Sequence, residues 1–209
     1  MTWLLEGDCL EVLPRFPDES VDAIVTDPPY NIGRDGTKPR KDYHEWLREV
    51  WSECGRIAKD EALLVFSWRV RCLPDLVPPE PWRLWHIGVW HKPLSLGGCW
   101  YGIAPHWEPL IFLLKGKKPW RPFRSKEVFS DVYVANVQLP RHGHPTEKPV
   151  GLYTRLLDFA CPPGGLVLDP LCGSGTTLIA AAKTGRSAVG IEINPDYISI
   201  AKNRLEAEV

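Results

Sequence analysis

The chain lacks the patterns that would place it in a membrane, outside the cell or around a structural metal. Its 209 residues contain no apolar run of membrane-spanning length, and the N-terminus shows no basic-then-apolar signal sequence. The six cysteines include no Cys-x-x-Cys pair and no nearby histidine pattern, so we expect reduced thiols, a cytoplasmic location and no metal site. A net charge of -1 argues against a protein that coats nucleic acid along its whole length, but it allows a local basic patch.

The most informative stretch follows the apolar run Val21–Thr26, where Asp27, Pro28, Pro29 and Tyr30 stand at the point where a buried strand would end. Proline fixes its own φ and has no backbone N–H, so this loop is held extended and presents mainly hydrogen-bond acceptors. The Asp27 carboxylate and the neighbouring carbonyls suit an amino group on a flat ring, and the ring can stack on Tyr30. An ordinary strand exit, capped by its aspartate, is the alternative. This motif alone does not decide between them.

A second informative turn follows the apolar run 166–168. Gly173 and Gly175 allow close backbone approach, and an alanine-rich helix beginning near Thr176 offers free N–H groups. No lysine follows Gly175 and there is no complete G-x-G-x-x-G, so this is not the phosphate loop of an NTPase. The next apolar strand ends in Glu192, where an acidic residue can accept both hydroxyls of a ribose. The pattern indicates a nucleoside-bearing ligand without a pyrophosphate, with a degenerate dinucleotide site as the alternative.

Two basic stretches lie elsewhere in the chain. Residues 34–41 contain four Arg or Lys residues directly after the Asp27 loop, and residues 115–126 contain six. Either stretch alone is explained equally well by a solvated surface. Together, with one of them next to the Asp27 loop, they fit contacts with nucleic-acid phosphates better.

Apolar, strand-like runs alternate with helical segments along the chain. We expect strands at 2–6, 21–26, 62–67, 84–90, 108–114, 166–168 and 187–191. We expect helices at 9–15, 43–58, 150–160, 176–183 and 195–206, and an irregular segment from 115 to about 141. This alternation predicts an α/β fold with a doubly wound, mostly parallel sheet and helices on both faces. The length predicts a single domain over residues 1–209, with a small insertion.

Three motifs, in this order, resemble the amino-methylating DNA methyltransferases. They are Asp27-Pro28-Pro29-Tyr30-Asn31, then His144-Pro145-Thr146-Glu147-Lys148-Pro149, then Asp169-Pro170 with Gly173-Ser174-Gly175-Thr176-Thr177. The order matches the subgroup whose catalytic motif precedes the cofactor motif (the β order), and the resemblance runs from about residue 3 to 205. It implies S-adenosylmethionine as cofactor, a Rossmann-like methyltransferase fold with a seven-stranded sheet that contains one reversed strand, and flipping of the target base out of double-stranded DNA.

The resemblance also assigns residues to the cofactor. It implies that the segment from Asp169 to Thr176 surrounds the methionine part and that Glu192 holds the ribose. It places Asp8 near the adenine of the cofactor, and Thr146 and Lys148 over its amino-acid end. The cofactor-binding residues expected are therefore Asp8, Thr146, Lys148, Asp169, Pro170, Gly173, Ser174, Gly175, Thr176 and Glu192. The catalytic residues expected are Asp27, Pro28, Pro29 and Tyr30.

A physical argument supports the same arrangement. A reversal of strand order opens a crevice at the carboxyl ends of the strands, so Asp27 and Asp169 lie side by side if their strands are neighbours. The exocyclic amine of adenine is a poor nucleophile because its lone pair is delocalised into the ring. Hydrogen bonds to the Asp27 carboxylate and the Pro28 carbonyl favour a pyramidal nitrogen, and the methyl transfer is then an in-line displacement that depends largely on positioning.

The prediction of the target base depends on the residue before Pro28. In this family an aspartate before Pro-Pro-Tyr is mostly associated with adenine and a serine with cytosine, so Asp27 favours adenine N6. Cytosine N4 is the alternative, and asparagine at this position is more usual in relatives that methylate RNA or protein amides. A catalytically silent module that binds cofactor or DNA is an alternative of another class, although Asp27 and Tyr30 are both present.

The segment at about 93–141 is the only material available for target recognition, and it is short. Three alternatives follow: a short recognition site, recognition completed by a partner in a homodimer, or almost no sequence preference. An orphan methyltransferase of phage or bacterial origin is favoured over one half of a large restriction-modification system.

Overall fold

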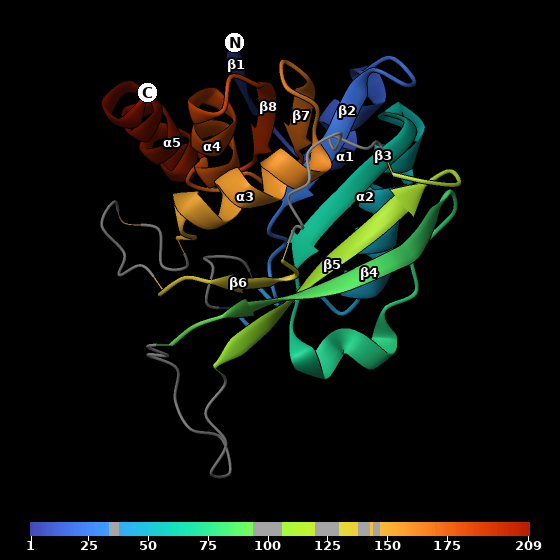
Figure 1. The fold of residues 1–209 in the computed structure, drawn as a ribbon. Helices are drawn as coiled ribbons and strands as arrows, with labels where there is room; N and C mark the ends of the chain where they lie inside the picture. The colour runs from blue at the N-terminus through green and yellow to red at the C-terminus, as the bar shows by residue number, and fades with distance from the viewer. Residues whose placement is uncertain (34–37, 94–105, 120–129, 138–142, 144–146) are drawn as a thin grey trace.

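The computed structural model describes residues 1–33, 38–93, 106–119, 130–137, 143 and 147–209 (Figure 1). Within these ranges the strands are β1 (Thr2–Glu6), β2 (Val21–Thr26), β3 (Ala58–Ser67), β4 (Trp82–His91), β5 (Trp107–Lys115), β6 (Val132–Val134), β7 (Leu166–Asp169) and β8 (Ser187–Glu192). The helices are α1 (Cys9–Val12), η1 (Leu13–Arg15), α2 (Tyr43–Ile57), η2 (Val70–Asp75), α3 (Val150–Ala160), α4 (Thr176–Lys183) and α5 (Pro195–Glu208). Strands and helices alternate as the sequence predicts, except that β4, β5 and β6 follow one another with no described helix between them.

All the described strands belong to one 8-stranded sheet, in the order β1-β8-β7-β2-β3-β5-β4-β6. Neighbouring strands are parallel except at β5, which runs antiparallel to both β3 and β4. The predicted neighbours β2 and β7 pair in parallel, with Ile24 opposite Leu168. The doubly wound, mostly parallel sheet with one reversed strand is therefore confirmed, and the strand order changes direction between β7 and β2.

The sheet has one strand more than the seven that the resemblance implied. The additional strand is β6, which pairs in parallel with the edge of β4 through Val89 opposite Val132. It lies in the segment that the sequence pattern indicated to be irregular. Three residues are too few to show a period-two pattern, so only the pairing with β4 identifies this strand. The insertion predicted at about 93–141 lies mostly outside the described residues and stays a prediction.

Helices cover both faces of the sheet, and the central strands are buried on both sides. On β2, Ile24 packs into the cluster that contains α1 and α2, whereas Ala23 and Val25 pack into the cluster that contains α3 and α4. Figure 1 shows α3 in front of the sheet and α2 behind it. Burial on both faces explains why these strands read as nearly continuous apolar runs instead of alternating ones.

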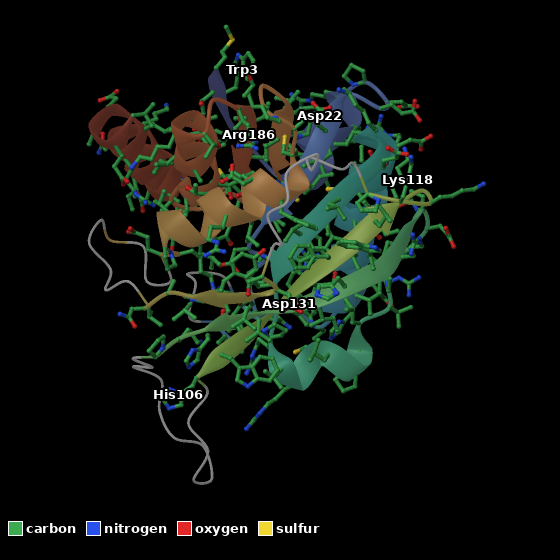
Figure 2. The ribbon with its side chains drawn as sticks, in the orientation of Figure 1. Trp3, Asp22, His106, Lys118, Asp131 and Arg186 are labelled. Atoms are coloured by element: carbon green, nitrogen blue, oxygen red, sulfur yellow. The ribbon has the colours of Figure 1, made fainter. Side chains whose placement is uncertain are left out.

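Polar side chains at the amino ends of the strands bind backbone groups and hold the sheet together. Asp22 accepts the N–H of Leu166 at 2.8 Å, which joins β2 to β7. Arg186, just before β8, donates from Nε to the carbonyl of Cys161 at 3.0 Å and so caps the end of α3. Both side chains lie in the upper part of Figure 2, far from His106, which precedes β5. The opposite, carboxyl-terminal edge of the sheet is therefore the place to look for a binding site.

Helix starts at that edge are fixed by local side chains. Asp8 ends the turn after β1 and accepts the N–H of Leu10 at 2.9 Å, as an N-cap residue does. Asn194 caps α5 in the same way through the N–H of Asp196 at 2.9 Å, with Pro195 at the first helical position. Among the residues described, none of the helices combines the length and apolar character that a membrane crossing requires.

Candidate active site

A row of polar side chains follows the carboxyl-terminal edge of the sheet in the order of the strands. From β1 to β5 this row contains Asp8, Glu192, Asp169, Asp27, Ser67 and Glu108. The first five follow or end parallel strands, whereas Glu108 is the second residue of the reversed strand β5. Because β5 is antiparallel, its beginning reaches the edge at which β3 ends, with Ser67 opposite Leu110. The two distant turns singled out in the sequence therefore lie on neighbouring strands.

Asp27 is surrounded by donors. Its Oδ1 accepts hydrogen bonds from the Ser67 hydroxyl and, at 3.3 Å, from the Tyr30 hydroxyl. Its Oδ2 lies 3.3 Å from the ammonium group of Lys148. Burial raises the pKa of Asp27, and Lys148 and Ser67 oppose this rise. The carboxylate is thus held in one orientation by three groups that all stabilise its ionised form.

The rigid backbone expected after Asp27 is also anchored from outside the loop. The hydroxyl of Tyr43, the first residue of α2, donates to the carbonyl of Pro29 at 2.5 Å. Tyr43 in turn stacks on Trp68, with ring centroids 6.3 Å apart. The loop is therefore fixed by its prolines and by a hydrogen bond from a helix that begins beside it.

The turn after β7 depends on glycine for its backbone conformation. Gly173 and Gly175 both have positive φ values, of 49° and 79°, which side-chain-bearing residues rarely adopt. A Cβ on Gly175 would lie 3.0 Å from the Cβ of Ala201 on α5. The turn therefore needs glycine at this position for its conformation and for its packing.

Carboxylates flank this turn on both sides. Glu192 accepts the N–H of Gly173 at 2.9 Å and the N–H of Asn194 at 2.8 Å, one on each oxygen. Each oxygen has a second acceptor position, so a pair of ribose hydroxyls can still bind. Burial, assisted by the nearby charge of Asp27, raises the pKa of Asp169 to about 6. Acidic groups around the turn disfavour phosphates and suit a ligand with hydroxyl and ammonium groups.

Lys148 does more than the sequence reasoning assigned to it. Its backbone carbonyl accepts the hydroxyl of Thr176 at 3.4 Å, which places the 147–149 segment against the start of α4. Its side chain, however, extends to the Asp27 loop and contacts Asp27 and Glu108. Thr146, the other residue predicted in this segment, lies outside the described residues. So do Arg34 and the 120–126 part of the second basic stretch.

Sequence reasoning missed four residues of this region. Ser67, Lys92 and Glu108 belong to the surroundings of Asp27. Arg204 on α5 donates from Nη1 to the carbonyl and the hydroxyl of Ser174, at 3.0 and 2.9 Å, and ion-pairs with Glu147 at 3.4 Å. Both side chains of that pair are 1% exposed, so Arg204 joins the glycine turn to the 147–149 segment. Of these four residues, only Ser67 carries a signal in the sequence, because it is a polar residue at the end of an apolar run.

Comparison with known proteins finds similar sequences and structures over nearly the whole chain. The family model described as DNA methylase matches residues 21–203. The DNA adenine methyltransferase YhdJ of Escherichia coli K12 is 30% identical, over 97% of this chain and 82% of that protein. The structure of TTHA0409 from Thermus thermophilus, complexed with S-adenosyl-L-methionine, is 29% identical and has a TM-score of 0.74, covering 100% of this chain and 95% of that one.

The PvuII DNA methyltransferase, which is cytosine-N4-specific, has a TM-score of 0.82 and covers 97% of this chain and 86% of that one. At 18% identity this likeness concerns the fold alone. The predicted Rossmann-like methyltransferase fold is confirmed by these superpositions.

Proposed function

Because this chain belongs to the DNA methylase family, we propose that it transfers the methyl group of S-adenosylmethionine to the N6 amine of adenine in double-stranded DNA. The observation that carries the proposal is the position of Asp27. Its loop follows β2, and β2 pairs with β7, the strand that leads into the glycine turn. The Asp27 carboxylate is oriented by Ser67, Tyr30 and Lys148. A target base and a cofactor can then meet at one edge of the sheet.

The cofactor site in this proposal is made of backbone and carboxylate groups. Glu192 accepts the ribose hydroxyls, Asp8 lies near the adenine ring, and the segment Asp169, Pro170, Gly173, Ser174, Gly175 and Thr176 surrounds the methionine part. Thr146 and the backbone of Lys148 cover its amino-acid end. The bound cofactor supplies a methyl group on a positively charged sulfur, which is a good leaving group. The acidic character of Asp8, Asp169 and Glu192 suits a ligand that carries positive charge.

The catalytic residues act on the amine. Asp27 and the carbonyl of Pro28 each accept one N–H, which localises the nitrogen lone pair and directs it at the methyl carbon. The carbon–nitrogen bond forms as the carbon–sulfur bond breaks, and the nitrogen then loses one proton to water. Pro29 keeps the loop extended, and Tyr30 stacks on the flipped base. Flipping costs on the order of a few kcal/mol, and stacking returns roughly 1–3 kcal/mol per base.

Adenine is favoured over cytosine because Asp27 stands where cytosine-specific relatives mostly have serine. The similarity to an adenine methyltransferase over nearly the full chain points the same way. Cytosine N4 is the second candidate, since the fold is also that of a cytosine-N4-specific enzyme. The same acceptors serve both amines.

Incubation with S-adenosylmethionine labelled in its methyl group tests this proposal. We expect label in double-stranded DNA, and we expect it in N6-methyladenine after digestion to nucleosides. A matched incubation with RNA is expected to give no label above background. Label in N4-methylcytosine would select the second candidate. Label in RNA but not in DNA would contradict the proposed substrate.

A further inference from the structure

Glu108 is the common partner of the charged groups around the catalytic loop. Its Oε1 lies 2.7 Å from the ammonium of Lys92. Its Oε2 accepts the hydroxyl of Tyr30 at 3.0 Å and lies 3.2 Å from the ammonium of Lys148. The side chains of Lys92 and Lys148 are only 8% and 10% exposed. An aspartate, a glutamate and two lysines thus form a balanced and mostly buried cluster.

Glu108 shares two of these donors with Asp27. The Lys148 ammonium lies at nearly equal distances from the two carboxylates, 3.3 Å from Asp27 and 3.2 Å from Glu108. The Tyr30 hydroxyl is nearer to Glu108, at 3.0 Å, than to Asp27, at 3.3 Å. A carboxylate offers about four acceptor positions, and Ser67 already uses one on Asp27. Tyr30 and Lys148 use one position each on Asp27 as well, so one position is left open for the target amine, and Glu108 holds both donors from their other side.

We propose that Glu108 is a positioning residue for methyl transfer, which anchors Tyr30 and Lys148 so that Asp27 can accept the target amine. This inference rests on the proposed function, which makes Asp27 the acceptor. Glu108 acts through its neighbours and does not touch the base. Lys92 balances its charge from the far side, since it binds the oxygen that Tyr30 and Lys148 do not use.

The charges of the cluster predict a change in the pH dependence of the rate that tests this role. Burial raises the pKa of Glu108, but Lys148 and Lys92 outweigh it and lower that pKa to about 2. Glu108 is thus ionised at every pH at which the protein is assayed, and its negative charge contributes to the raised pKa of Asp27. Among the described residues, Tyr30, Tyr153 and Asp169 also interact electrostatically with Asp27. Removal of Glu108 lowers the pKa of Asp27, so the acidic limb of the rate–pH profile moves to lower pH.

Two variants test the proposal against wild type and a control. Glu108→Gln removes the charge, but it leaves Lys92 buried without its partner, which destabilises the fold. The double variant Glu108→Gln with Lys92→Met keeps the charges balanced and is the decisive protein if the single variant does not fold. The control is Glu61→Gln, because Glu61 is a half-exposed carboxylate on β3 whose lysine partner, Lys118, is 3.8 Å away.

The measurement is the single-turnover rate of DNA methylation across pH, with the dissociation constant for S-adenosylmethionine. We expect the double variant to react roughly 10- to 100-fold more slowly, the effect of one to two charged hydrogen bonds. We also expect unchanged cofactor binding and an acidic limb at lower pH. The proposed role of Glu108 would be overturned if the double variant reacted as fast as Glu61→Gln, or if it reacted more slowly without a shift of the acidic limb of the rate–pH profile. Either result would leave the proposed function standing. A wild-type protein that methylates no DNA would overturn both.

Discussion

Replacement of Asp27 by alanine is expected to slow methyl transfer to DNA by about 10³-fold, the upper end of the effect of losing one preorganised electrostatic contact in an active site. The carboxylate is the charged acceptor for the amine, and the carbonyl of Pro28 cannot replace it. Cofactor binding is expected to change little, because the groups assigned to the cofactor come from other strands. The measurement is single-turnover transfer of a labelled methyl group, with cofactor affinity determined by calorimetry.

The matched control is Asp60→Ala, since Asp60 is an exposed aspartate on β3. We expect the control to methylate DNA at the wild-type rate. An Asp27→Ala protein that keeps wild-type activity would show that the amine is activated elsewhere. An Asp27→Ala protein that loses cofactor binding as well would show that the two halves of the site are not separate.

Replacement of Glu192 by alanine is expected to weaken S-adenosylmethionine binding by roughly 10- to 100-fold, because hydrogen bonds to charged groups contribute about 1.5–3 kcal/mol. Two effects combine here. The ribose hydroxyls lose their acceptor, and the N–H of Gly173 loses the carboxylate that holds the glycine turn. The rate at saturating cofactor is expected to fall much less, since Glu192 does not contact the Asp27 loop and β7 lies between their strands.

Glu6→Ala is the control for this variant. Glu6 is exposed and lies on β1 directly opposite Glu192 in the sheet register, so its replacement removes a nearby carboxylate without touching the turn. Cofactor titration followed by tryptophan fluorescence or calorimetry measures both proteins. Equal affinities for Glu192→Ala and Glu6→Ala would mean that the ribose is bound by other groups.

Much of the fold was predictable because its signals are local. Strands buried on both faces gave long apolar runs, and the helices between them indicated a parallel sheet. Parallel strands bring their carboxyl ends to one edge, so the sequence predicts that Asp27 and Asp169 lie together, and β2 pairs with β7 accordingly. The resemblance to the methyltransferase family added the motif order and the cofactor, which no local pattern gave.

The missing parts of the site depend on tertiary pairing. Glu108 reaches the catalytic edge only because β5 is antiparallel and starts there, and its position before an apolar run carries no such information. Arg204 looks like one more surface charge on a polar helix, although it is buried against the glycine turn. Lys148 was assigned from its motif, which does not specify that its side chain reaches Asp27. The homodimer and the recognition segment at 93–141 stay predictions.

A crystal structure of this protein with bound S-adenosylmethionine tests most directly whether the Asp27 loop and the glycine turn form one site. We expect the ribose hydroxyls within hydrogen-bonding distance of Glu192 and the sulfonium methyl group directed at the space beside Asp27 and Tyr30. A cofactor seated at another place, or a methyl group directed away from the Asp27 carboxylate, would contradict this mechanism.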